Sequence, residues 1–181
     1  MTIDFTPGTW TLDTAHTVVG FSVRHAGISK VRGQFTEADA TLTVGGSLDA
    51  SAVKAVVKTA SFDSNDDNRD AHVKGEDFFN VEQFPEMTFV SRSVAGTPEE
   101  FQLTGELTIK ETTLPVTFDV EFGGVAVDPF GATRAGFSAT AQISRKAFGI
   151  TWNAALEAGG VLVGDKVTIS IDSAFVKPAA N

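Results

Sequence analysis

Apolar residues in the second half of the chain recur at every second position, and this period constrains the fold more than any other feature. The clearest run lies in 113–122, where the apolar members are Leu114, Val116, Phe118, Val120 and Phe122. Similar runs occupy 101–110, 134–144 and 166–175. Because successive side chains of a strand point to opposite faces, this period indicates strands with one dry face and one wet face.

Less regular extended stretches precede these four runs, at 19–23, 31–44, 52–62 and 87–94. Together they predict an all-β chain of about eight strands. The gaps between strands are short and rich in glycine, as at Gly45-Gly46, which favours antiparallel neighbours.

Two segments break the alternation. Residues 64–75 open with capping residues and acids and close with Lys74-Gly75, so they are predicted to form a short helix, which 76–80 could extend by a turn. The stretch 146–165 is unusually apolar for a loop, and we expect it to cover part of the core.

Antiparallel strands with one apolar face can bury that face in two ways, as a pair of packed sheets or as one sheet closed on itself. Closure removes exposed edges, so we expect a closed eight-stranded barrel with one or two short helices near its mouth. Such a barrel is either just filled by side chains or holds one small ligand. The small residues expected to point inward are Gly105, Ala135, Ala139 and Ala141. They would leave room for a slender molecule, but a tapered and fully packed core would have the same sequence pattern.

Length and composition narrow the choice of function. The 181 residues predict one domain, 9–177, between flexible termini 1–8 and 178–181. With no cysteine, the chain cannot form disulfides or use a thiolate. The net charge of −9 argues against nucleic acid and anionic membrane surfaces as partners. The 15 phenylalanines, with no tyrosine, supply apolar surface without hydroxyl groups that need partners.

The first ten residues contain no basic segment, apolar run or cleavage site of an export signal, and no stretch is long and apolar enough to cross a bilayer as a helix. We therefore expect a cytoplasmic protein.

Motifs of familiar chemistry are absent from the sequence. The histidines, His16, His25 and His72, are not paired at metal-ligand spacing, and there is no nucleophile elbow or phosphate loop. Residues 63–68 resemble the start of a calcium loop, but Asn68 and Lys74 occupy its glycine and closing glutamate positions, so helix capping explains the acids better. We expect no metal, no cofactor and no catalytic residue.

Polar and cationic residues gather near the expected strand ends and loops: His25, Lys30, Arg32, Asn68, Arg69, His72 and Arg145. At a barrel mouth they could receive a polar or phosphorylated headgroup. Alternatively they pair with neighbouring acids as surface salt bridges of little energetic weight.

Short motifs along the chain resemble the YceI-like family. They are Phe21-Ser-Val-Arg-His25 with 27–35, Asn68-Arg-Asp-Ala-His72 with 77–80 and Phe84-Pro85, then 103–109, 145–149, Trp152-Asn153 and 159–165. The resemblance covers 10–176, and it implies a lipocalin-like barrel whose hydrophobic tunnel holds a long-chain isoprenoid or similar amphipathic lipid. Many members carry an export signal, which this sequence lacks; transport, sequestration and stress response are roles the family suggests.

On this basis we expect a soluble binding or carrier protein. Its predicted tunnel residues are Phe21, Val23, Phe35, Phe89, Leu103, Leu107, Phe118 and Phe137. A lid is expected from 68–79 and 148–152, with Phe79, Phe148 and Trp152 facing the lipid, and the headgroup is assigned to His25, Arg32, Arg69 and His72.

Two other functions stay open from the sequence. One is an enzyme acting on a lipid or terpenoid, with His25 or His72 as general base. The other is a filled barrel that serves as a protein interaction module, and a homodimer is compatible with either.

Overall fold

The computed structural model describes residues 6–177, which form eleven strands, one α-helix and four short 3₁₀ turns. The strands are β1 (Gly8–Leu12), β2 (Val18–His25), β3 (Ser29–Phe35), β4 (Ala38–Val44), β5 (Ala52–Lys58), β6 (Phe62–Asp63), β7 (Glu86–Gly96), β8 (Glu100–Ile109), β9 (Thr112–Val127), β10 (Thr133–Ser144) and β11 (Val163–Val176). The helix is α1 (Asp67–Lys74), and the turns are η1 (Thr14–His16), η2 (Leu48–Ala50), η3 (Thr59–Ser61) and η4 (Lys146–Phe148).

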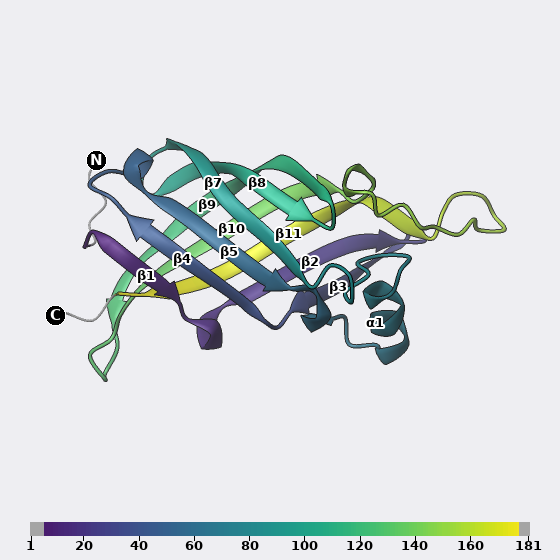
Figure 1. The fold of residues 1–181 in the computed structure, drawn as a ribbon, viewed down its shortest axis with the longest axis horizontal. Coiled ribbons are helices and arrows are strands. Elements are labelled where there is room, and N and C mark those ends of the chain that lie inside the picture. Colours follow the sequence, from purple (N-terminus) through teal and green to yellow (C-terminus); the bar gives the residue numbers. More distant parts are fainter. Residues whose placement is uncertain (1–5, 178–181) are drawn as a thin grey trace.

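Eight of the strands close into a barrel, as predicted. They follow the order β1-β4-β5-β7-β8-β9-β10-β11, every neighbouring pair is antiparallel, and β11 pairs back with β1 through Leu12↔Phe175 and Thr11↔Val176. Figure 1 shows the long strands crossing the elongated barrel obliquely, as closure of a sheet requires.

The remaining three strands form an extension at one end of the barrel. The edge of β11 that pairs with β1 at Phe175 and Val176 also pairs with β2, from Val163 to Asp172. On its other side β2 pairs with β3. The wall divides here, because β3 continues to β6 whereas β4 continues to β5. The segment carrying α1 lies beside this division, at the end opposite the chain termini (Figure 1).

Some expected elements differ in extent. The stretch 31–44 is two strands, because the chain turns at Thr36 and Glu37, and β1 was not predicted. The helix is shorter than expected: Asp66 caps it by accepting a hydrogen bond from the Arg69 amide, and 76–80 form hydrogen-bonded turns instead of another helical turn. Of the termini expected to be flexible, 1–5 and 178–181 lie outside the described residues, whereas Gly8 begins β1.

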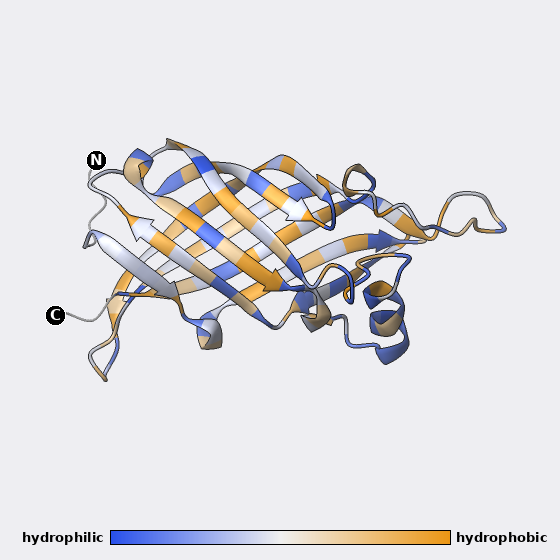
Figure 2. Ribbon diagram, in the orientation of Figure 1, coloured by the Kyte–Doolittle hydropathy of each residue, from blue (hydrophilic) through white to orange (hydrophobic). Residues whose placement is uncertain are grey.

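The alternation read from the sequence corresponds to the inner and outer faces of the barrel. In β9 the residues Val116, Phe118 and Val120 are buried, and the polar residues between them are exposed. Figure 2 shows hydrophobic and hydrophilic residues alternating along the long strands. A separate small core lies near the termini around Trp10, which is fully buried beside Val44 and Phe175. None of the helices formed by residues 6–177 has the length and hydrophobicity needed to cross a membrane.

Candidate functional site, an apolar cavity inside the barrel

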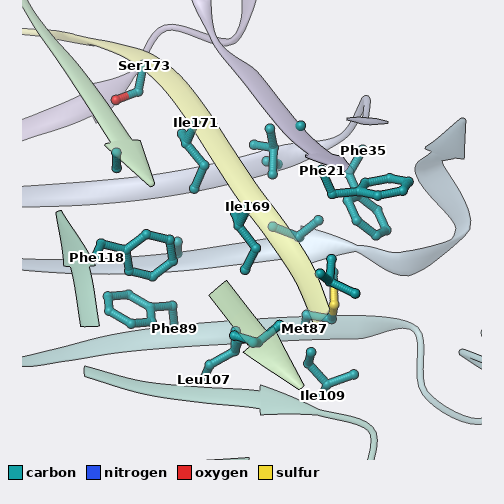
Figure 3. A pocket seen from close by; sticks show the side chains of 18 of the residues that line it. Phe21, Phe35, Met87, Phe89, Leu107, Ile109, Phe118, Ile169, Ile171 and Ser173 are labelled. Atoms are coloured by element: carbon teal, nitrogen blue, oxygen red, sulfur yellow. The ribbon is translucent and has the colours of Figure 1, made fainter. Parts of the chain in front are cut away.

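A cavity of about 470 Å³ lies inside the barrel. This volume falls within the range of about 300–1,000 Å³ that small-molecule sites occupy. In the close view of Figure 3 the rings of Phe89 and Phe118 stand side by side, isoleucines of β11 project between the strands, and Ser173 provides the one labelled hydroxyl. The interior is therefore partly hollow, and its wall is almost entirely apolar.

All but one of the residues predicted for the site border this cavity. They are Phe21, Val23, His25, Phe35, Arg69, His72, Phe79, Phe89, Leu103, Leu107, Phe118, Phe137, Phe148 and Trp152. Their position on the wall follows from strand alternation and from the turns that cover the open end; contact with a ligand stays a prediction.

Arg32 does not border the cavity. It is exposed on β3, on the face opposite Val31 and Phe35, and its cross-strand neighbour is Ser22. The assignment of Arg32 to the headgroup was therefore wrong in its geometry: Phe35 was predicted to face inward, and Arg32, three residues earlier on the same strand, falls on the opposite face.

Two groups of rings narrow the end of the cavity next to α1. The Phe62 ring lies 5.1 Å from that of Phe21 and 5.7 Å from that of Phe35, measured between centroids. Nearer the surface, the His72 ring meets the Trp152 ring edge to face, with centroids 4.7 Å apart. The centroid of the Phe78 ring lies 5.1 Å from that of His72. These contacts bring together α1, the turns after it and Trp152, which belong to the segments 68–79 and 148–152 that were expected to form a lid.

The polar side chains at this end are bound mainly to the protein itself. Arg69 donates to the hydroxyl and the carbonyl of Ser64, and the His72 Nε2 lies 2.9 Å from a carboxylate oxygen of Asp77. Both residues nevertheless border the cavity.

Arg145 has a structural role. Its guanidinium is buried and donates to the carbonyl oxygens of Gly164, Ile150, Trp152 and Val163. Burial lowers its pKa, with an opposing contribution from the nearby charge of Asp165. The arginine ties the 146–165 loop to the barrel, which explains how an apolar loop can cover the mouth.

Several wall residues were not singled out from the sequence, among them Met87, Ile109, Ile150, Ile169 and Ile171. For Ile169 and Ile171 the period-two pattern of β11 was a sufficient signal, because inward positions of a barrel strand face its interior. Within 6–177 no three histidine or acidic side chains come together as a potential metal site.

Comparison with known proteins agrees with this geometry. The model of the YceI-like domain matches residues 10–175. A UPF0312 protein of Staphylococcus aureus (strain USA300) is 38% identical over 169 residues, covering 92% of this chain and 96% of its own.

Solved structures share the fold. A YceI protein of Campylobacter jejuni is 29% identical, with a TM-score of 0.71 over 97% of this chain and 99% of its own. A polyisoprenoid-binding domain from Saccharophagus degradans, 10% identical, superposes with a TM-score of 0.71 over 96% of this chain and 100% of its own. With the family model covering nearly the whole chain and the staphylococcal relative well above chance identity, this protein belongs to the YceI-like family.

Proposed function

We propose that this protein binds a long-chain isoprenoid or a similar amphipathic lipid inside the barrel and shields it from water. The observation that carries the proposal is the apolar cavity of about 470 Å³ within a closed wall. The S. degradans domain, described as polyisoprenoid-binding, supports it through the common fold.

The physical basis is burial of apolar surface. An isoprenoid chain of several units exposes several hundred Å², and at about 25 cal/mol per Å² its burial would contribute on the order of 10 kcal/mol before the entropy of binding is subtracted. Phenylalanine rings and branched aliphatic side chains make no hydrogen-bond demands, so we expect the cavity to accept chains of similar width and differing chemistry.

The distribution of charge predicts the direction of the lipid. Apart from Asp39, the ionisable wall residues are Arg24, His25, Arg69, His72 and Arg145. They lie on β2, on α1 and at the start of the 146–165 loop, whereas the other end is closed by the core around Trp10. We place the tail deep in the barrel and the polar group near His25, Arg69 and His72.

A pair of adjacent substitutions on β10 tests the proposal. Ala139 borders the cavity, and Thr140 is exposed on the outer face. Ala139→Phe adds a ring to the cavity, whereas Thr140→Phe adds the same ring outside. Native mass spectrometry of protein offered geranylgeraniol should show a bound chain for the wild type and for Thr140→Phe, and loss of at least about 90% of it for Ala139→Phe.

Solvent extraction of the purified protein, followed by mass spectrometry of the extract, identifies the natural ligand. If no lipid co-purifies and no prenyl chain or fatty acid is taken up, the proposal is wrong. Equal uptake by the two phenylalanine variants would place the ligand elsewhere on the protein.

A further inference from the structure

The β2–β3 hairpin carries an unusual charge for this protein. The chain has 23 acidic residues, yet none lies between Asp13 and Glu37, and this interval contains Arg24, Lys30 and Arg32. The hairpin is therefore a cationic surface on a protein whose net charge is −9.

Arg24, Lys30 and Arg32 share the face of the hairpin opposite Val23 and Val31, which we call the cationic face; Arg24 also borders the cavity. Arg24 is paired directly with Lys30 across the strands, and Arg32 is paired with Ser22 two positions along. All three are exposed, and within 6–177 none of them forms an ion pair. Like charges directly opposite each other destabilise a sheet, so fold stability does not account for this arrangement.

An apolar tip lies next to the cationic face. The hairpin turns at 26–28, and Ile28 at its end is 85% exposed. The Ala26 amide donates to the Leu162 carbonyl, which holds the tip against the 146–165 loop, where Val161 is half exposed. Lys30 follows Ile28 by two residues, or about 7 Å along the strand.

Neighbouring acids compensate this charge only in part. On the segments that adjoin the hairpin the acids are Glu157 in the loop, Asp165 and Asp172 on β11, and Asp63 on β6, which is paired with Gln34 of β3. Asp165 accepts hydrogen bonds from the Ser144 hydroxyl and the Lys146 amide, and Lys166 and Lys146 add exposed positive charge beside it. The end of the molecule that carries the cavity mouth thus presents an apolar tip with cations behind it.

We propose that the β2–β3 hairpin docks the protein on an anionic lipid bilayer, with Ile28 in the interfacial region and the cationic face on the headgroups. Anionic headgroups attract exposed lysine and arginine, and an apolar side chain ahead of the cations gains free energy by leaving water. The net charge alone predicts repulsion, but charges beyond about 8–10 Å are largely screened at physiological salt, so the local surface decides.

The tip favours a bilayer over nucleic acid, because a phosphate backbone offers no apolar region to Ile28. It also lies at the cavity end where the cationic wall residues gather, so docking would bring the mouth to a source or acceptor of lipid. The inference goes beyond binding inside the barrel, and neither docking nor its test requires an occupied cavity.

The test is flotation of the purified protein with vesicles of phosphatidylcholine alone and of phosphatidylcholine with phosphatidylglycerol in equal parts. We expect binding to the anionic vesicles only, and its loss at about 1 M salt, where charges are screened beyond about 3 Å. The Lys30→Gln/Arg32→Gln double variant should bind roughly 20- to 30-fold more weakly, and Ile28→Asp at least about tenfold more weakly.

Two control variants are matched to these changes. Phe130 is 95% exposed at the tip of the β9–β10 hairpin, which lies beside the far end of β11, and Lys54 is exposed on β5. Phe130→Asp and Lys54→Gln should leave vesicle binding within about twofold of the wild type. Circular dichroism verifies that each variant is folded, and geranylgeraniol uptake should be unchanged in all of them.

Equal binding to neutral vesicles, insensitivity to salt, or equal losses in the control variants would overturn the docking proposal. Tighter binding to a mixed-sequence DNA duplex than to anionic vesicles would also overturn it. Because lipid uptake is measured separately, failure of docking and failure of the proposed cavity function give different results.

Discussion

Two glycines, one on β3 of the extension and one on β8 of the barrel, receive the edge of a phenylalanine ring where a side chain would otherwise stand. A Cβ atom at Gly33 would lie 2.4 Å from Cζ of Phe21, and one at Gly105 would lie 2.4 Å from Cζ of Phe89. The second ring is held edge to face against Phe118, with centroids 5.3 Å apart. Glycine at these positions therefore lets bulky rings lie close to the sheet.

Gly105→Ala tests this arrangement. Besides the ring, the new methyl would meet the Val90 carbonyl oxygen at 2.5 Å, and a backbone atom of a paired strand cannot rotate away. We expect the free energy of unfolding to fall by about 1–3 kcal/mol, the usual effect of overpacking. Urea unfolding followed by circular dichroism measures the change.

Gly136→Ala on β10 is the matched control, because the nearest atom to its added methyl is a backbone oxygen 4.0 Å away. There we expect no loss of stability, since removing a glycine also lowers the entropy of the unfolded chain. Equal losses in the two variants would contradict the steric explanation.

The residues of the cavity wall could be predicted where the alternation of a strand alone determines which side chains point inward, as for Phe118 and Leu107. Gly105 is a different case: the sequence indicated an inward small residue that leaves room, whereas the ring of Phe89 occupies that room. This contact depends on the register of β7 against β8, which shifts between Ser91 and Ser93. The sequence analysis did not anticipate the irregularity at this shift, so the contact between Gly105 and the Phe89 ring was not predicted.

At the scale of elements, an arginine connects three segments near the chain termini. Arg134, on β10, donates from Nε to an Asp13 carboxylate oxygen at 2.7 Å and forms an ion pair with Asp128 in the preceding turn. Asp13 follows β1, the short strand that completes the barrel. The hydrogen bond from Arg134 holds the pKa of each carboxyl group below its usual value, and His16 assists at Asp13.

This cluster predicts a specific dependence of stability on pH. Because the folded-state pKa values of Asp13 and Asp128 lie below the unfolded value near 3.8, the ion pairs stabilise the fold above that pH, and the contribution disappears as the pH falls through the lower folded values. Arg134→Gln should therefore be less stable than the wild type at neutral pH, and the difference should shrink below about pH 4. Urea unfolding at a series of pH values measures it.

Arg92→Gln is the control, because its partner Glu106 and Arg92 itself are both about half exposed. Exposed pairs contribute at most about 1 kcal/mol, so little change is expected at any pH. A difference between wild type and Arg134→Gln that stays constant down to about pH 2 would exclude the carboxyl groups as its source.

Elements were predictable in proportion to the length of their pattern. The twelve residues of β10 and the fourteen of β11 repeat the alternation many times, and the sequence located both. The five residues of β1 contain one buried side chain, Trp10, which is too few for a period to appear. The break between β3 and β4 was missed although the sequence marks it, because the apolar positions change phase across Thr36 and Glu37, from Val31 and Phe35 to Ala38, Ala40, Leu42 and Val44.

For the whole molecule, closure could be predicted from the sequence because it follows from the need to remove sheet edges. Whether the closed barrel is filled or hollow could not, since the same phenylalanines suit both. The volume depends on where the rings lie, on the division between β3 and β4, and on the loop that Arg145 holds over the mouth.

A hollow barrel that binds lipid only when folded must gain stability from its ligand. For a protein stripped of lipid, adding geranylgeraniol to about 100 times its dissociation constant should raise the free energy of unfolding by about 2.7 kcal/mol. Urea unfolding at several lipid concentrations gives the increment. Ala139→Phe should show none, because its ring occupies the binding space, and Thr140→Phe should respond as the wild type does. An equal gain in Ala139→Phe would mean that the stabilising lipid binds outside the cavity, on surface that both variants keep.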